Sequence, residues 1–209
     1  KQKTAYEIMP SLVGSEMCIR DSSSPIYVTG EDRDFPMINW ECLEFTPYKI
    51  ESVGYRTVDQ HVLDSFPDLE EWVFQHVLDY VIGAMGVDPD LHWPEITCSW
   101  INKYKKGQAS VPHHHANSMY SGNIFLQGDT GNLVFEKPKH MVVEPTLSQQ
   151  NLYNSTSFTL PPIKSVLCMF PSDLMHHTLP NESESDRITL SINVMVRGQP
   201  RWIEDNANV

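Results

Sequence analysis

The densest group of metal-binding side chains in the sequence is a run of three histidines, residues 113–115. In an extended segment, alternate side chains point to the same side, so His113 and His115 would share one face and His114 would point away. Two imidazoles on one face can hold a single metal ion. A third ligand must come from elsewhere, and the adjacent pair His176 and His177 can supply it. A three-point facial site of this kind leaves coordination positions open for reactants.

A histidine run also has simpler explanations, which are a solvated loop or part of a purification tag. A tag normally lies at a terminus, whereas this run lies in the middle of the chain between two apolar-rich segments. The metal site is therefore a hypothesis that needs support from the rest of the sequence.

Composition limits the classes of protein to consider. The 209 residues are enough for one sizeable core, so a single domain is expected. The formal net charge of −12 argues against general nucleic-acid binding, which needs clustered Lys and Arg. No apolar run is long enough to span a membrane. Four scattered cysteines, no CxxC pair and no apolar secretory signal predict a reducing, cytoplasmic setting.

The N-terminal segment is set apart from the rest of the chain. Residues 10–22 resemble the peptide obtained when a sequencing adapter is translated, so we interpret residues 1–22 as adapter-derived and leave them out of the fold argument. The alternative is a genuine but unstructured N-terminus. We expect residues 23–198 to form the single domain and the polar residues 199–209 to form a loose tail.

Residues 67–85 carry the clearest helical pattern. Ser65 can cap this helix, Pro67 suits its first turn, and Gly86 can end it. His76 lies on the apolar stripe, where we expect a packed core histidine and not a metal ligand. The stripe recurs with a period of 3.6 residues, at Leu69, Trp72, Val73, His76, Val77, Tyr80, Val81 and Ala84.

Most of the remaining chain alternates in the manner of β-strands. The strands 120–126 and 132–136 are expected to pair as a β-hairpin through the turn at 128–131. Residues 137–162 form a long polar connection, typical of a functional loop, with weak strand signals at 141–143 and 157–160. The elements together predict an α+β fold with a β-sandwich or jelly-roll body. The predicted strands are 26–28, 44–46, 96–104, 120–126, 132–136, 164–170 and 187–196, with one more leading into the histidine run.

The last predicted strand has the sharpest alternation. One face is apolar, and the other carries Arg187, Thr189, Ser191 and Asn193. A polar face of this kind can be exposed to solvent, or it can line an internal cavity. In the second case Arg187 and the Thr189 hydroxyl would form a carboxylate clamp, in which a guanidinium fork acts together with an O–H donor.

Taken in order, these motifs resemble the 2-oxoglutarate/Fe(II)-dependent oxygenases of the prolyl-hydroxylase-like branch, and in particular a group of small members from phages and marine bacteria. The pattern of that group is W-x-N, G, H-x-H-x-x-S-x-x-S-G, F-P-S-x-x-x-H and R-x-(S/T). The resemblance covers roughly residues 100–196. The matching positions are residues 100–102, Gly107, and residues 113–122, 170–176 and 187–189.

The resemblance implies that residues 23–198 form a double-stranded β-helix, a kind of jelly roll, with one or two packed helices. It implies Fe(II) held by His113, His115 and His176. It also implies that 2-oxoglutarate binds the iron, with its far carboxylate at Arg187 and Thr189.

Two ligand choices within this resemblance need comment. His176 is preferred to His177 because the family histidine follows the phenylalanine of F-P-S by six positions. Most of the superfamily carries Asp or Glu where His115 stands, whereas the small group carries His. The alternative pairing of His115 with Asn117 would give a poor iron site, because an amide is a weak ligand. His114 is expected to be exposed or to lie behind the ligands.

The resemblance also implies a reaction and a pocket. The reaction is hydroxylation of an unidentified small-molecule or peptidyl substrate by O₂, with release of succinate and CO₂ and with no catalytic residue beyond the metal ligands. Two alternatives are a three-histidine zinc enzyme that hydrates or hydrolyses its substrate, and a jelly-roll binding module without catalytic activity. The residues expected to line the cavity are Asn102, Tyr104, Ser191 and Asn193, with Trp100 either beside them or purely structural.

Overall fold

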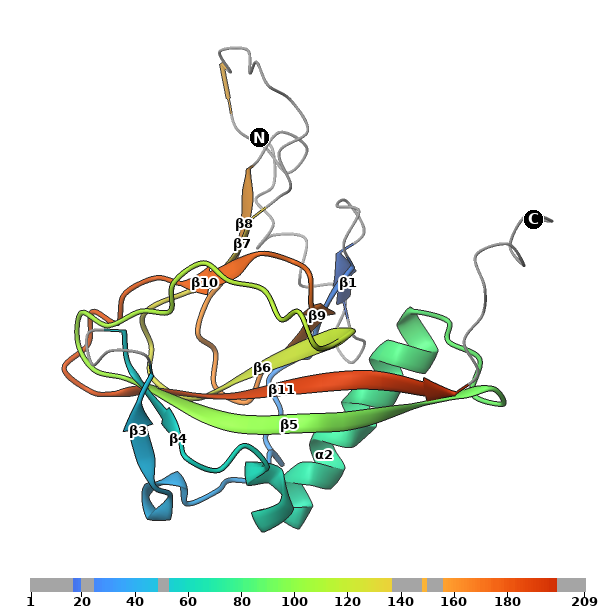
Figure 1. Ribbon diagram of the computed structural model, residues 1–209. Helices are drawn as coiled ribbons and strands as arrows, with labels where there is room; N and C mark the ends of the chain where they lie inside the picture. The colour runs from blue at the N-terminus through green and yellow to red at the C-terminus, as the bar shows by residue number, and fades with distance from the viewer. Residues whose placement is uncertain (1–16, 20–24, 49–52, 137–147, 150–155, 199–209) are drawn as a thin grey trace.

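The computed structural model describes residues 17–19, 25–48, 53–136, 148–149 and 156–198, which form two antiparallel β-sheets and one α-helix (Figure 1). No helix in these ranges is long and apolar enough to cross a bilayer. The smaller sheet has the order β10 (His176–Thr178), β7 (Leu133–Glu136), β8 (Ser157–Leu160). The larger sheet has the order β1 (Met17–Ile19), β2 (Ile26–Val28), β9 (Leu167–Pro171), β6 (Tyr120–Gln127), β11 (Arg187–Gly198), β5 (His92–Tyr104), β4 (Tyr55–Thr57), β3 (Phe45–Pro47).

The long strand β11 lies at the centre of the larger sheet. It pairs with β5 from Arg187 opposite Tyr104 to Gly198 opposite His92, and its other edge pairs with β6. Its apolar residues belong to the core that the sheet shares with the helix. Its polar residues Arg187, Thr189 and Ser191 are also buried, on the side of the smaller sheet. The strand is therefore covered on both faces, and its polar row does not face bulk solvent.

Helix α2 (Pro67–Leu78) covers the outer face of the larger sheet (Figure 1), as its apolar stripe predicts. The helix continues as the π-helical segment η4 (Asp79–Ala84), and Gly86 with φ +69° follows its end. The predicted Ser65 cap is wrong. Phe66 is the N-cap residue and no side-chain cap bond forms, because Ser65 belongs to the short 3₁₀ helix η3 (Val62–Ser65).

A second core lies between the two sheets. Aromatic rings dominate it, and Phe135 of β7 meets Phe170 of β9 edge-on with ring centroids 4.8 Å apart. This packing holds the smaller sheet over β6 and β9, so that the polar face of β11 is enclosed and a pocket remains between the layers. The buried members are Ile26, Phe125, Leu133, Phe135, Leu160, Cys168, Phe170 and Leu174.

The chain from β6 to β7 does not form the predicted hairpin. β6 pairs with β11 and β9 in the larger sheet, whereas β7 pairs with β10 and β8 in the smaller sheet. Gly128 and Gly131 have φ values of +108° and +84°, which few other residues adopt, and they let the chain cross between the sheets. The prediction was wrong because a turn signal marks a change of direction and says nothing about the next pairing partner.

Other differences concern the bounds of elements. β5 begins at His92, earlier than predicted, and the short 3₁₀ helix η2 (Trp40–Cys42) precedes β3. No strand leads into the histidine run, because the chain between β5 and β6 contains only the isolated bridge of His113 with His176. Residues 141–143 and the tail 199–209 lie outside the described residues. Of the segment 1–22, only β1 is described, and it pairs with β2.

Candidate metal centre

A pocket of about 360 Å³ lies between the two sheets. It is bounded by the polar face of β11, alternate residues of β5, and the irregular segment that carries the histidine run. All four residues predicted to line a cavity are in its wall, and Trp100 is there as well. Its lining includes Trp100, Asn102, Tyr104, His113, His115, Phe170, His176, Thr178, Thr189, Ser191 and Asn193.

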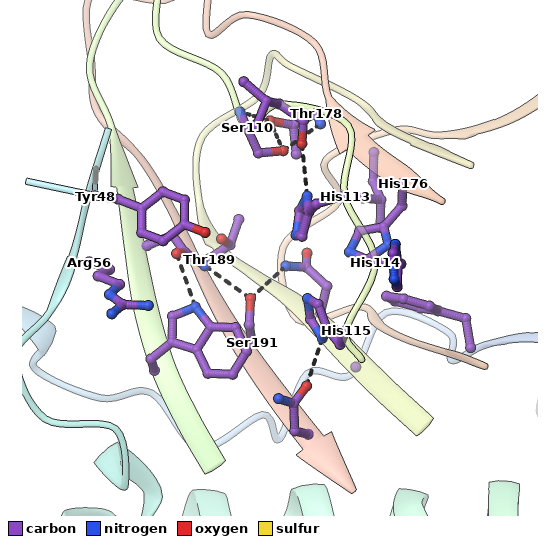
Figure 2. A pocket seen from close by; sticks show the side chains of 18 of the residues that line it. Tyr48, Arg56, Ser110, His113, His114, His115, His176, Thr178, Thr189 and Ser191 are labelled. Atoms are coloured by element: carbon purple, nitrogen blue, oxygen red, sulfur yellow. Dashed lines mark hydrogen bonds between the residues drawn. The ribbon is translucent and has the colours of Figure 1, made fainter. Parts of the chain in front are cut away.

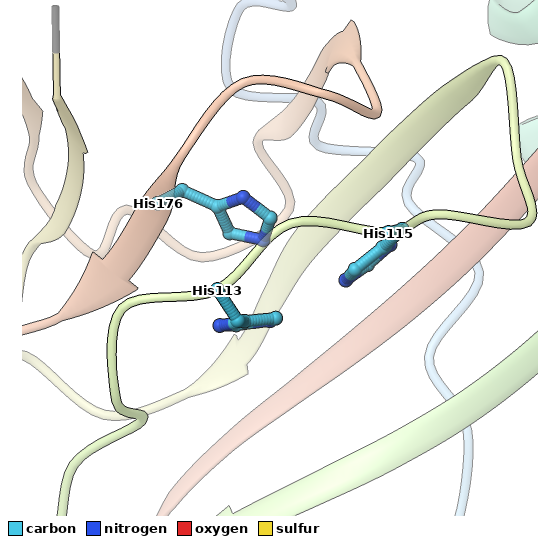
Figure 3. Close-up of side chains that lie close together, drawn as sticks. All are labelled: His113, His115 and His176. Atoms are coloured by element: carbon cyan, nitrogen blue, oxygen red, sulfur yellow. The ribbon is translucent and has the colours of Figure 1, made fainter.

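Three histidines meet in this pocket (Figure 3). His113 and His115 come from the histidine run and His176 comes from β10, and one ring nitrogen of each lies within 4.8 Å of the others. His114 is exposed, and the Nδ1 atom of His177 lies 3.4 Å from a glutamate carboxylate of β7. The structure therefore gathers the three histidines predicted as ligands, and neither neighbour joins the group.

Backbone hydrogen bonds hold the histidine run beside β10. His113 and His176 exchange N–H to carbonyl bonds of 3.0 and 2.9 Å, and the His115 N–H donates to the Ser172 carbonyl at 2.8 Å. The run is therefore extended at the two ligand positions although it is not part of a sheet. This local extension keeps His113 and His115 on one side, as their spacing requires.

The Nδ1 atoms of His113 and His176 are each held by a backbone carbonyl. Both contacts are 2.8 Å long, from His113 to the Val111 oxygen and from His176 to the Leu174 oxygen. A carbonyl oxygen can only accept, so Nδ1 carries the hydrogen in both rings and Nε2 is the atom able to bind a metal. A hydrogen bond from the outer nitrogen is the usual way in which proteins orient metal-binding histidines.

His115 obtains the same orientation from side chains. Its Nδ1 lies 2.7 Å from Asn193 Oδ1 and 2.8 Å from Ser121 Oγ, and Ser121 Oγ lies 2.7 Å from Ser172 Oγ. The hydroxyl groups of Ser121 and Ser172 can donate or accept, whereas the amide oxygen of Asn193 can only accept. The hydrogen bond to Asn193 therefore requires that Nδ1 of His115 carries the hydrogen. The three rings therefore share one tautomer, with Nε2 as the potential ligand atom.

Burial keeps two of these histidines neutral. It lowers the pKa of His176 to about 3 and that of His115 to about 4, while the hydrogen bond to Asn193 partly opposes the shift at His115. The ring of Phe170 packs edge-on against His176 with centroids 4.7 Å apart and forms part of the apolar wall. Neutral imidazole is the form that binds metals, so both rings are ready to do so at neutral pH.

Arg187 is fully buried, and no carboxylate among the described residues pairs with it. Its Nη1 donates to the carbonyls of Gly131 (2.9 Å) and Leu179 (2.8 Å). Its Nη2 donates to Thr178 Oγ1 at 2.7 Å, and its Nε has no partner in the described structure. The guanidinium also packs over the ring of Tyr104, with Cζ 4.4 Å from the ring centroid. Burial lowers the pKa of Arg187 to about 10, which leaves it charged at neutral pH. An unpaired buried cation is unfavourable alone and suits an anionic ligand.

Thr178 connects this arginine to the metal centre. It follows His176 on the same short strand, accepts the bond from Arg187 Nη2, and lines the pocket together with Tyr104 and Thr189. Of the two predicted clamp residues, Thr189 lines the pocket that also contains the histidines, whereas Arg187 is not part of the lining and lies behind Thr178. Thr178 was not predicted, because a three-residue strand carries no periodic pattern that would mark it.

Gly131 is required by the position of Arg187. A Cβ atom at residue 131 would lie 1.5 Å from Arg187 Nη1 and 2.8 Å from the Leu179 carbonyl oxygen. Its φ of +84° is a second reason for glycine. The close approach brings the backbone carbonyl of residue 131 to the guanidinium, so the glycine helps to hold the buried charge.

Tyr48 and Arg56 also line the pocket, and sequence reasoning missed both. Arg56 lies on β4 opposite Asn102 of β5, and its Cζ is 5.0 Å from the centre of the Tyr48 ring. Figure 2 places these two side chains across the pocket from His176. Their segments are short and have no pattern pointing to a site, so only the strand pairing reveals them.

The fold is shared with solved 2-oxoglutarate/Fe(II) oxygenases, which supports a jelly-roll core. The non-heme alpha ketoglutarate dependent carbocyclase SnoK from nogalamycin biosynthesis superposes with a TM-score of 0.52 at 12% identity, over 79% of this chain and 74% of that one. A 2OG-Fe(II) oxygenase family oxidoreductase from Burkholderia pseudomallei superposes with a TM-score of 0.51 at 15% identity, over 74% of this chain and 72% of that one. HygX from Streptomyces hygroscopicus, solved with nickel, 2-oxoglutarate and hygromycin B, superposes with a TM-score of 0.50 at 11% identity, over 81% of this chain and 82% of that one.

A family model points the same way. Residues 98–193 match the family described as "Putative 2OG-Fe(II) oxygenase". The matched region contains the three histidines, Arg187 and Asn193. No curated protein matches the chain. The family match covers less than half of the chain, and the solved structures share its fold.

Proposed function

We propose that this protein is an Fe(II)- and 2-oxoglutarate-dependent oxygenase with a double-stranded β-helix core, and that it hydroxylates its substrate. The observation that carries the proposal is a histidine group in one pocket together with a buried cation behind the wall of that pocket. Three histidines have their Nδ1 atoms fixed and their ring nitrogens gathered within 4.8 Å. The buried cation Arg187, which has no described acidic partner, lies behind Thr178 of the same pocket wall.

The residues fit the two proposed cofactors. Imidazole is a suitable ligand for Fe(II), and a neutral triad of His113, His115 and His176 leaves the positive charge of the metal without compensation from the protein. A dicarboxylate would supply that compensation and a second negative charge for Arg187. Iron with bound 2-oxoglutarate supplies the oxidising chemistry, in which O₂ is consumed and succinate and CO₂ are released.

The protein's own residues bind, orient and exclude water. Arg187 would hold the far carboxylate of 2-oxoglutarate with those N–H groups, Nε among them, that do not already donate to backbone carbonyls. Thr178 and Thr189 would add hydroxyl groups beside that carboxylate. Phe170 packs against His176, and Leu133 of β7 lies opposite Thr178 in the pocket wall; their apolar surface would limit access of water to the metal. No further catalytic residue is needed in this scheme.

The test is an anaerobic titration of the purified protein with Fe(II) and then with 2-oxoglutarate, following the visible charge-transfer band. We expect the band in the wild type and in His177→Ala, and no iron binding in His176→Ala. His177 is a matched control because it is adjacent in sequence and outside the metal-binding group. Arg187→Lys should keep iron and weaken 2-oxoglutarate binding at least about tenfold, because lysine keeps the charge and loses the planar fork.

Three results would contradict the proposal. Stoichiometric iron in His176→Ala would remove that ligand. Unchanged 2-oxoglutarate affinity in Arg187→Lys would remove the clamp. Iron binding without any effect of 2-oxoglutarate in the wild type would reject the oxygenase assignment in favour of another three-histidine metal chemistry.

A further inference from the structure

The pocket lining contains an arginine, Arg56, that the proposed chemistry does not use. Arg56 is half-buried and lines the pocket, and no described carboxylate forms an ion pair with it. Its described contact is with the face of the Tyr48 ring. Arg187 lies behind Thr178 and outside the lining, whereas Arg56 is itself a lining residue, and Figure 2 shows Arg56 apart from Thr178.

The charge of the lining contrasts with that of the whole chain. The sequence has 27 acidic and 15 basic residues, yet no Asp or Glu is present among the described residues that line the pocket. With a divalent metal at the histidines, the pocket would be positive at two ends. A wall without carboxylates does not repel an anion, and an unpaired guanidinium attracts one.

A continuous row of side chains joins Arg56 to the metal centre. Arg56 pairs with Asn102 across β4 and β5, so their side chains are on the same face of the sheet. Trp100 is on that face two residues earlier, and its indole N–H donates to Asn102 Oδ1 at 3.1 Å. The Trp100 ring lies 5.7 Å, centroid to centroid, from that of His115. A ligand held at Arg56 would therefore extend along an aromatic wall toward the histidines.

We propose that Arg56 binds the carboxylate of a small organic acid, and that this acid is the substrate. The inference rests on the proposed oxygenase function, which it deepens by naming the substrate class. One guanidinium balances one carboxylate, whereas a phosphate group of charge near −2 is usually met by more donors than this part of the wall offers. The volume of about 360 Å³ must also admit 2-oxoglutarate, so the body of the substrate is small.

The test uses matched pairs of neutral and charged probes. The panel consists of C2–C6 and phenyl-substituted monocarboxylic acids, each with its primary amide, titrated calorimetrically into protein loaded with Ni(II) and 2-oxoglutarate. We expect at least one acid to bind about tenfold or more tightly than its amide. Arg56→Gln should abolish this preference, and Arg56→Lys should keep part of it. Arg33→Gln is the control, because it removes the same charge from an exposed position outside the described pocket lining.

Each outcome decides the inference. It is wrong if no acid is preferred over its amide, or if Arg56→Gln keeps the preference. It is also wrong if Arg56→Gln weakens 2-oxoglutarate binding itself, because Arg56 would then serve the cosubstrate while the oxygenase function stands. If the wild type binds neither Ni(II) nor 2-oxoglutarate, the proposed function fails. The acid and amide comparison on the metal-free protein then decides the carboxylate site separately.

Discussion

The side-chain network behind His115 gives the sharpest test of the metal centre. The orientation of the His115 ring depends on Asn193 and Ser121. Asn193→Ala removes one of these two partners. The Ser121 hydroxyl can then accept from His115 and donate to Ser172, which is 2.7 Å away, so the loss is partly compensated.

The hydrogen bonds of His115 set the expected losses in metal affinity. A neutral hydrogen bond contributes about 1 kcal/mol net, which is about fivefold, and Ser121 compensates part of it, so Asn193→Ala should weaken metal binding by no more than about fivefold. Removing the Ser121 hydroxyl as well leaves the buried Nδ1–H group of His115 without a partner, which costs about 1–3 kcal/mol. The His115 ring is then free to carry its hydrogen on Nε2 instead. A ring with hydrogen on Nε2 cannot present that nitrogen to the metal. The double variant Asn193→Ala/Ser121→Ala should therefore lose about a hundredfold in affinity.

The assay is competition for Co(II) against a chromophoric chelator at pH 7.5, with the melting temperature of each metal-free variant measured in parallel. Asn123→Ala is the control, because Asn123 lines the same pocket and hydrogen-bonds Ser191, a residue outside the metal-binding group. It should bind metal within about twofold of the wild type. The reasoning is refuted if the double variant keeps wild-type affinity, since His115 would then not be a ligand. Equal losses in Asn123→Ala would show general damage to the pocket.

Two further predictions concern stability. Gly131→Ala should lower the free energy of unfolding by at least about 2 kcal/mol, through the positive φ and the clash with Arg187. Gly30→Ala, where the added Cβ has no neighbour within 4 Å, should change it little, and urea denaturation compares them. Because the pKa values of His115 and His176 are lowered in the folded state, the unfolded chain binds more protons below pH 6.5, and the metal-free protein should lose stability as the pH falls from about 6 to 4. The two histidines together contribute at most about 2.7 kcal/mol per pH unit to the dependence of the unfolding free energy on pH. His176→Gln should reduce this slope by about 1.4 kcal/mol per pH unit, which corresponds to one proton. An unchanged slope would contradict the burial of His176.

Local patterns were read correctly where the contacts that matter are local. The helical stripe predicted α2, because residues three and four apart share a face whatever the rest of the chain does. The alternation in the last strand placed Thr189, Ser191 and Asn193 on one face, where they line the pocket, and Arg187 packs over Tyr104 of the same wall. The β6–β7 hairpin failed because strand pairing is a choice among distant partners, and the strand expected before the histidine run failed for the same reason.

The sequence by itself determined the chemical inventory of the site: three imidazoles at the right spacing, an arginine and a threonine two residues apart, and a strand with one polar face. The tertiary structure decided how they are used. Packing of the smaller sheet over β11 turned its polar face into a cavity wall, and the bridge between His113 and His176 placed the His176 ring in one group with His113 and His115. Asn193 and Ser121 behind His115, and Arg56 across the pocket, also became visible only in three dimensions. The physical reason is that periodicity fixes which way a side chain points, whereas its neighbours are set by pairing and packing between segments far apart in the chain.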